Sequence, residues 1–314
     1  MSAILSITFP IYAAIAIGYL IVAKGWFSVS DMRVLGKYVL NIALPALLFN
    51  AVASRDVSEV FQPGYMLVFA LGGLATLVVA WLWFTVTGSD KPRRAVAVMG
   101  STCANSGFVG YPVMLLTFPD IAGVILALNM LVENFLVIPI CLILMDLARD
   151  SQSHSIPRTI ARAIWGVLRR PMVIGLLLGL AVSLAQVTMP DVVSRLFVML
   201  AASASALSLI VVGGSLVGLK LSGNRARALQ VAFGKLLLHP GMVALAAMIL
   251  PLLGLAALTP DMYAAVILSA AMPMFGIYTV LAQELDLEGA ASIAMLVATS
   301  LAFISLSVFL FWLT

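Results

Sequence analysis

The chain has 314 residues, of which 63% are hydrophobic and only 10% are charged, with a formal net charge of +4 and a pI of about 9.2. Soluble domains are about 45–50% apolar and about 25% charged, so this composition excludes a soluble globular domain and indicates a polytopic helical membrane protein. The basic pI then concerns membrane orientation, and nucleic acid is not an expected partner.

Ten apolar runs are long enough to cross a bilayer as helices, since a span needs about 20 residues. The first run lacks the positively charged start of a signal peptide, so it is expected to be a span and not a cleaved signal. The predicted spans cover residues 3–23, 34–53, 65–87, 95–118, 121–146, 172–188, 196–219, 236–257, 262–283 and 290–312.

The distribution of basic residues predicts the orientation. Of the 17 Lys and Arg residues, all but Arg55 and Arg195 fall on the side of the connections that follow the odd-numbered spans. The positive-inside rule places that side in the cytoplasm and both termini outside. Lys235 and His239 lie one turn apart at the expected cytoplasmic end of the eighth span, where Lys235 is expected to snorkel. No Lys or Arg is expected at the midplane.

The longest polar connection, residues 147–171, lies in the middle of the chain and is basic. It separates a first repeat of five spans, residues 1–146, from a second repeat, residues 172–314. Because five is an odd number, the two repeats must have opposite orientations in the membrane. The predicted fold is therefore all-α, with ten transmembrane helices in two inverted five-helix repeats.

The fourth span contains a polar, glycine-rich interruption at residues 103–112. Pro112 removes an amide and Gly107 and Gly110 loosen the backbone, so this span is expected to unwind near its centre. A half-helix that begins there points free N–H groups and a positive dipole end inward, which favours a carboxylate. The alternative is a proline kink with glycines at a tight helix crossing. The candidate substrate-binding residues are Asn105, Ser106, Gly107, Gly110, Tyr111 and Pro112.

The ninth span is also interrupted, at residues 271–276. Spans 4 and 9 hold corresponding places in the two repeats, and paired interruptions of this kind point to a binding site near the midplane. Pro273 would free backbone groups there, and the Tyr278 hydroxyl lies about one turn further on. Pro273, Met274 and Tyr278 are therefore further substrate-binding candidates.

Glu133 lies near the middle of the fifth span. A carboxylate at the bilayer centre costs roughly 2.5 kcal/mol or more, so it should face a cavity or a partner. Asn129 shares its helix face and Asn134 follows it directly, which makes these three residues candidates for proton or ion coupling. The alternative is a structural hydrogen bond that locks this span against a neighbour.

Asn41 and Pro45 give the second span a polar group and a kink. Structural packing around the broken helix is the favoured interpretation. Asn41 is also kept as a candidate substrate ligand.

No catalytic pattern is found in the sequence. There is no cluster of metal ligands, no Gly-x-x-x-x-Gly-Lys phosphate loop and no serine–histidine pairing in the membrane. The chain is therefore not expected to be an enzyme or an ATP-driven pump, and no cofactor or metal is expected.

Two motifs carry a family resemblance. Asn41-x-x-Leu44-Pro45-Ala46-Leu47-Leu48-Phe49, followed by Asn105-x-x-x-x-Gly110-x-Pro112, resembles the auxin efflux carrier family, which includes plant auxin exporters and bacterial malonate and malate carriers. The resemblance implies an inverted 5+5 repeat whose spans mix in a scaffold and a transport subdomain with crossing broken helices 4 and 9. It also implies that Asn105 touches an organic-acid anion and that Pro273 marks the second crossing.

The chain departs from the plant members of that family in two respects. Ala104 stands where the plant exporters have a crossover proline, and the large cytoplasmic loop of many plant members is absent. A short bacterial-type carrier of dicarboxylates is therefore a better expectation than an auxin exporter.

The expected function is secondary active transport of small organic-acid anions such as malonate or malate, by alternating access and with proton coupling as one hypothesis. The alternatives are a sodium-coupled symporter of the bile-acid type and a non-transporting membrane sensor or scaffold. The expected partners are membrane lipid, a small carboxylate, a coupling proton or sodium ion, and a second copy in a homodimer. The expected location is the bacterial inner membrane.

Overall fold

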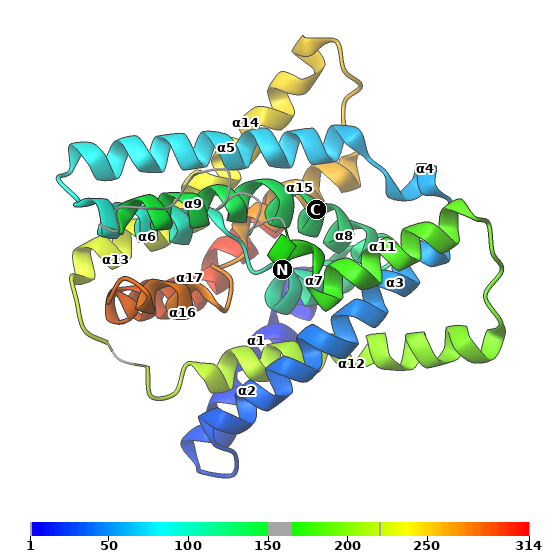
Figure 1. The fold of residues 1–314 in the computed structure, drawn as a ribbon, viewed down its shortest axis with the longest axis horizontal. Helices are drawn as coiled ribbons and strands as arrows, with labels where there is room; N and C mark the ends of the chain where they lie inside the picture. Colours follow the sequence, from blue (N-terminus) through cyan, green and yellow to red (C-terminus); the bar gives the residue numbers. More distant parts are fainter. Residues whose placement is uncertain (1, 150–164, 220, 314) are drawn as a thin grey trace. The chain divides into compact units, whose positions relative to one another are not determined.

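The computed structural model describes residues 2–149, 165–219 and 221–313. Throughout these residues the regular structure is helical, with one isolated backbone bridge (Figure 1). Seven helical stretches are long and apolar enough to cross a membrane, so the class of all-helical polytopic membrane protein is confirmed. They cover Ile4–Ala23, Val29–Ala53, Val57–Val86, Ala122–Ala148, Asp191–Ser215, Arg225–Leu252 and Glu288–Leu313. Shorter apolar helices cover Ser106–Thr117, Pro171–Leu184 and Pro260–Ala271.

The chain forms two compact units, and each unit takes segments from both halves of the sequence. Unit 1 consists of Met1–Pro63, Ser106–Met130 and Gly166–Gly218. Unit 2 consists of Gly64–Asn105, Leu131–Trp165 and Leu219–Thr314. Most of the predicted central connection, including Arg158 and Arg162, lies outside the described residues.

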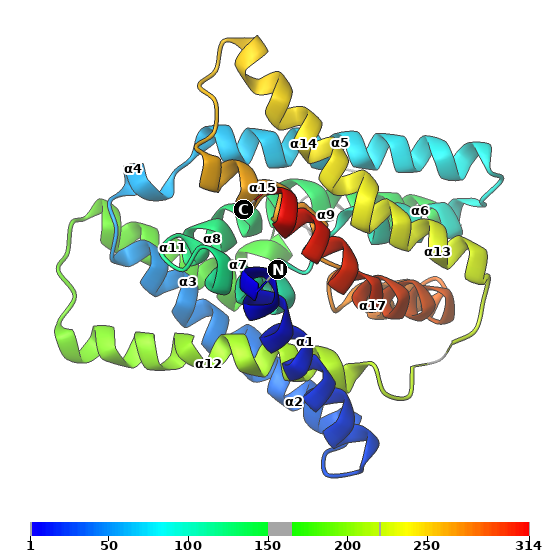
Figure 2. The same ribbon diagram turned by 180° about the vertical axis from the view of Figure 1, so that it is seen from behind.

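In unit 1, α12 packs against α1, α2 and α3, while α11 packs against α3. Figure 2 shows α1 crossing α12. A Cβ atom at Gly213 of α12 would lie 1.8 Å from the carbonyl oxygen of Ile15, so only glycine permits this approach of the two backbones. The helices of the unit are α1 (Ser2–Ala23), α2 (Val29–Tyr38), α3 (Leu44–Ala53), α4 (Val57–Val60), α7 (Tyr111–Thr117), α8 (Ala122–Val132, which ends in unit 2), α11 (Pro171–Leu184) and α12 (Asp191–Ser215).

In unit 2, α17 packs against α6, α13, α15 and α16, and α14 packs against α15. Buried polar contacts add α5 to this group: the Tyr65 hydroxyl lies 3.1 Å from the Ser269 hydroxyl of α15. The helices of the unit are α5 (Pro63–Val86, which starts in unit 1), α6 (Lys91–Thr102), α9 (Ile138–Ala148), α13 (Arg225–Phe233), α14 (His239–Ile249), α15 (Pro260–Ala271), α16 (Tyr278–Gln283) and α17 (Glu288–Leu313).

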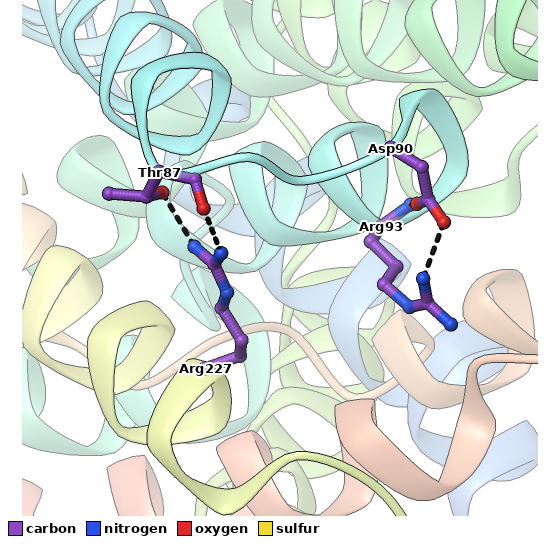
Figure 3. Close-up of polar contacts among 4 residues, drawn as sticks. All are labelled: Thr87, Asp90, Arg93 and Arg227. Atoms are coloured by element: carbon purple, nitrogen blue, oxygen red, sulfur yellow. Dashed lines mark hydrogen bonds and ion pairs between the residues drawn. The ribbon is translucent and has the colours of Figure 1, made fainter.

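Polar side chains fix one end of unit 2, where α5, α6 and α13 meet (Figure 3). Asp90 caps α6 by accepting a hydrogen bond from the Arg93 amide at 2.9 Å, and it also pairs with the Arg93 guanidinium. Arg227 of α13 donates to the hydroxyl of Thr87 at 2.5 Å and to the Thr87 carbonyl. The guanidinium therefore ties the first turn of α13 to the end of α5.

Four turns of π-helix occur in the described helices, and each ends two residues before a proline. Proline lacks an N–H and its ring clashes with the carbonyl four residues earlier, and a π turn relieves both problems by widening the helix locally. The π turns are η1 (Val39–Ala43), η2 (Ser106–Gly110), η3 (Glu133–Val137) and η4 (Gly234–Leu238), which precede Pro45, Pro112, Pro139 and Pro240.

The predicted start of the eighth span is wrong. The helix begins at Arg225, where the Asn224 side chain caps it by accepting from the Arg227 amide, and not near residue 236. At 1.5 Å per residue, Lys235 therefore lies about 15 Å inside the helical stretch. Lys235 does not belong to a connection, so the predicted charge bias rests on the other basic residues.

Candidate functional site

The two interrupted spans touch each other inside unit 2. Helix α6 ends at Thr102 and α15 ends at Ala271, and the next residues, Cys103 and Met272, have extended backbones with ψ angles of 118° and 149°. An antiparallel bridge pairs Ala104 with Met274. Two broken helices thus meet through their backbones, as two short strands would.

Two backbone hydrogen bonds hold this contact. The Asn105 amide donates to the Pro273 carbonyl at 2.8 Å, and the Phe275 amide donates to the Cys103 carbonyl at 3.4 Å. Ala104 and Met274 are buried. Since a helix end leaves its terminal carbonyl groups without intrahelical partners, the contact gathers polar backbone in the buried interior of the unit. Backbone groups of this kind can coordinate a small polar solute.

The position of the first break differs from the prediction. The extended segment is Cys103–Asn105, whereas Gly107 and Gly110 lie in the π turn η2 and Pro112 lies in the first turn of α7. The reason is that proline is tolerated in the first turn of a helix, and the π turn accommodates its ring. The helix is therefore interrupted before the glycines and not at the proline.

Lys235 is a further candidate residue for the site, and its place was not predicted from the sequence. Its side chain is fully buried, with 0% exposure, and its Nζ donates to the Ala270 carbonyl at 2.6 Å and lies 2.8 Å from His239 Nδ1. The predicted snorkelling of Lys235 is therefore wrong, and its ammonium group lies at the end of α15, next to the second break. An ammonium group at the C-terminus of α15 is favourable, because the carbonyl end of a helix carries partial negative charge.

Glu133 adds a negative group to the same interior. It is 3% exposed in η3 and interacts electrostatically with Lys235 and with Cys103. The Cys103 sulfur lies 3.8 Å from the sulfur of Cys141, and both cysteines are buried free thiols. A buried cation and a buried carboxylate thus lie close to the contact between the two breaks.

A cavity of about 570 Å³ lies in unit 2, beside α6, α13 and the start of α16. Arg93, Arg227 and Glu288 are among the residues that line it, together with the buried Tyr278. Tyr278 is the first residue of α16, directly after the second break. Figure 3 shows the two arginines of this cavity. Two arginines and two carboxylates, Asp286 and Glu288, therefore line this cavity, and its lining within the described residues has no excess of positive charge.

The structure brings part of the predicted set together. Asn105, Pro273, Met274, Tyr278, Glu133 and Asn134 are buried and all belong to unit 2. The other predicted residues belong to unit 1, where Ser106, Gly107, Gly110, Tyr111 and Pro112 are buried in η2 and α7, and Asn129 is buried in α8.

Asn41 is also in unit 1, but its side chain is exposed. Its amide nitrogen donates to the Lys37 carbonyl at 2.7 Å, four residues earlier in the helix. This bond satisfies a backbone carbonyl beside the π turn η1.

The described residues contain no group of three or more His, Cys, Asp or Glu side chains that could hold a metal ion. The polar atoms that the site does offer are backbone carbonyl and amide groups, one ammonium, one carboxylate and short neutral side chains. Groups of these kinds are chemically able to coordinate a small anion or cation.

Comparison with known proteins agrees with a transport role. A Rhizobium meliloti (strain 1021) protein named "Putative malonate transporter" is 27% identical over 255 residues, which cover 78% of this chain and 77% of that protein. The Escherichia coli (strain K12) protein named as transporter YfdV is 24% identical over 285 residues, covering 86% of this chain and 88% of the relative. A protein of Methanothermobacter thermautotrophicus named as a transporter is 28% identical over 100 residues, about a third of each chain.

Residues 3–310 match the family described as Membrane transport protein, and this match covers nearly the whole chain. The resemblance carried by the Asn41 and Asn105 motifs is thereby confirmed. The protein belongs to the Membrane transport protein family, which is the auxin efflux carrier family.

Proposed function

We propose that the protein is a secondary carrier that moves small organic-acid anions of the malonate and malate class by alternating access. The observation that carries this proposal is the backbone contact between the two broken helices, at Ala104 and Met274. A broken backbone in a bilayer is tolerated only where protein or water satisfies it, and carriers use it to coordinate solutes. The Rhizobium relative named for malonate supports the substrate class.

The proposed architecture has ten spans: the seven long helical stretches, the short helix α11, and two broken spans, α6 with α7 and α15 with α16. They would form two inverted repeats, residues 1–146 and 172–314, whose spans mix in a scaffold and a transport subdomain. The composition of unit 2, which takes segments from both halves of the chain, supports this arrangement. The proposed setting is a bacterial inner membrane with both termini outside, and a homodimer is the proposed assembly.

The substrate carboxylate would bind at the paired breaks in unit 2. Asn105 would donate its side-chain amide, and the positive charge of Lys235, at the end of α15, would attract the anion. A charged hydrogen bond of this kind is worth about 1.5–3 kcal/mol. Ser106, Gly107, Gly110, Tyr111, Pro112 and Asn41 are proposed to complete the substrate pathway, and Asn129 and Asn134 to support Glu133 in coupling.

Replacing Asn105 with alanine tests the proposal. The purified variant should keep its folded state but lose malonate-induced thermal stabilisation and malonate uptake into proteoliposomes, because a ligand that binds only the native state raises its melting temperature. Gln62→Ala serves as the control: within the described residues, the Gln62 amide donates to the carbonyl groups of Ser58 and Glu59, in the preceding turn of the same chain segment. Uptake by Asn105→Ala at the wild-type rate would remove Asn105 from the site.

Two other functions make different predictions. In a sodium-coupled symporter of the bile-acid type, the unwound carbonyl groups hold cations, and uptake would require sodium. Here the Lys235 ammonium already occupies the Ala270 carbonyl, which supports a carrier without a sodium ion at that position. A membrane sensor or scaffold would show no solute flux in proteoliposomes.

A further inference from the structure

An apolar groove of about 790 Å³ lies in unit 2, between α5, α13 with η4, and α17. These helices belong to stretches that are long and apolar enough to cross a membrane. The floor of the groove is buried at Ala80, Phe84 and Leu236, whereas its rim is open, with Trp83 53% and Phe233 63% exposed. An apolar space of this kind excludes water, so within a bilayer a lipid chain can fill it.

The polar side chains of the groove are distributed unevenly. Ser101 and Ser305 each donate to a carbonyl of their own helix, at 2.9 Å and 3.4 Å, so neither hydroxyl needs a ligand. Gln230, in the second turn of α13, accepts from the Arg227 guanidinium at 3.4 Å. Among the described residues that line the groove, none is charged. The groove therefore matches a molecule that is apolar along its length and polar at one end, beside Gln230.

Two arginines lie at the end of the groove that Gln230 marks. Arg227 donates to Thr87 (Figure 3), and Thr87 follows Ala80 by seven residues, about two turns, so it lies on the groove's face of α5. Arg225 is the first residue of α13, and its side chain is exposed. The N-terminal end of a helix also carries partial positive charge. This end of the groove thus favours an anionic group.

The carboxylates in this part of unit 2 have other surroundings. Asp90 pairs with Arg93. Asp286 and Glu288 line the cavity of about 570 Å³ described above, and so does Arg227. Arg225 is not part of the lining of that cavity, so it is the exposed cation that an anionic group at the end of the groove would meet.

We propose that this groove is a binding site for an anionic phospholipid, with an acyl chain in the groove and the phosphate at Arg225. Basic residues at the membrane surface attract anionic headgroups, and the positive-inside rule assigns this end of the groove to the cytoplasmic leaflet, where such lipids are found. The inference does not rest on the proposed carrier function, because lipid binding needs no transported substrate.

The bound chain would pack against the segments that form the candidate site. Gly234 lines the groove and directly precedes Lys235. A Cβ atom at Gly234 would lie 2.7 Å from the Ser101 hydroxyl, so η4 and α6 are in close contact there. Ser101 lies two residues before the first break, which starts at Cys103. A lipid that binds the folded groove should therefore stabilise unit 2 and raise the Tm of the protein.

Native mass spectrometry of the delipidated, detergent-purified protein tests the headgroup. Phosphatidylglycerol and phosphatidylcholine with the same acyl chains are offered at equal concentration, and wild type should retain phosphatidylglycerol in preference. Arg225→Gln should lower this preference about fivefold, the factor that corresponds to one basic residue near an anionic lipid. Arg195→Gln removes an exposed arginine of unit 1 and should behave as wild type. Equal retention of the two lipids by wild type, or an unchanged preference in Arg225→Gln, would overturn the inference.

A second pair of variants tests the position of the acyl chain. Val79→Trp fills the groove from its rim, whereas Val78→Trp adds the same bulk at an exposed residue of α5 outside the described lining. Val79→Trp should retain less phosphatidylglycerol and lose the rise in Tm that the lipid gives wild type, and Val78→Trp should keep both. Equal lipid binding by the two variants would place the lipid elsewhere and reject the proposed site. Displacement of the lipid by glycerol 3-phosphate, the soluble part of the headgroup, would indicate a site for a free phosphate ester and would also reject it.

Discussion

Removing the buried ammonium group of Lys235 should destabilise the protein, because the Glu133 carboxylate is then left without the positive charge that acts on it. In Lys235→Met, a side chain of similar length fills the space without charge. The Ala270 carbonyl loses the donor that lies 2.6 Å away, and Glu133 loses the cation that acts on it. Both losses occur in the buried interior of unit 2, where water cannot replace the missing partner.

The size of the effect follows from the burial. Removing one partner of a buried charge pair costs about 3–5 kcal/mol, because the other charge is left without compensation. Unfolding entropy near 2.1 cal/mol/K per residue gives about 0.66 kcal/mol/K for a chain of this length, so each kcal/mol shifts Tm by about 1.5 °C. The Tm of Lys235→Met should therefore fall by about 5–8 °C.

Thermal unfolding of the detergent-purified protein, followed by tryptophan fluorescence, measures this shift. The double variant Lys235→Met with Glu133→Gln should recover at least half of the lost Tm, because no charge remains uncompensated. Lowering the pH should narrow the gap between Lys235→Met and wild type, since protonation of Glu133 removes the lone charge. A Tm within about 1 °C of wild type, or a double variant less stable than Lys235→Met, would refute the reasoning.

Two further predictions concern the framework around the breaks. In Gly100→Ala, the added Cβ would lie 2.5 Å from the Tyr278 hydroxyl and 2.7 Å from Val231, so stability should fall by about 1–3 kcal/mol. In the control Gly241→Ala, the added Cβ meets nothing within 4 Å and alanine favours the helix, so stability should not fall. Equal Tm values for the two variants would contradict this. Asp90→Ala removes the cap of α6 and should cost about 1 kcal/mol, measured by the same unfolding assay, and an unchanged Tm would show that the cap contributes nothing.

Much of the fold could be predicted from the sequence, because length and hydropathy decide whether a helix can cross a bilayer. The two interruptions were visible for a similar reason: glycine, proline and short polar residues rarely gather in an apolar run. The first break was predicted too close to Pro112, because a proline inside a helix is expected to interrupt it at that position. In the structure, the π turn before it absorbs the steric conflict, and the extended backbone is Cys103–Asn105.

Lys235 was missed for a different reason. An apolar run is taken to end at its first charged residue, so the sequence predicts that the eleven residues from Arg225 to Lys235 belong to a connection. The cap at Asn224 was a local signal that the helix starts earlier. The partners of Lys235, namely the Ala270 carbonyl and Glu133, come from distant parts of the sequence. A local sequence pattern does not predict contacts between residues that are far apart in the chain. For the same reason it does not predict the division of the chain into two discontinuous units.

The pair of thiols at the first break gives the protein an internal reporter. Cys103 is the first residue of that break, its sulfur lies 3.8 Å from Cys141, and the chain has two cysteines in all. Both are shielded from solvent, and a thiol reacts with an alkylating reagent only when it can ionise in contact with water. The rate of alkylation of the unmodified protein therefore measures how often the interior of unit 2 becomes wet. A carboxylate bound at the breaks would exclude water and protect both thiols from alkylation. The alkylation rate therefore reports how much of the protein has a ligand bound, without introducing any label.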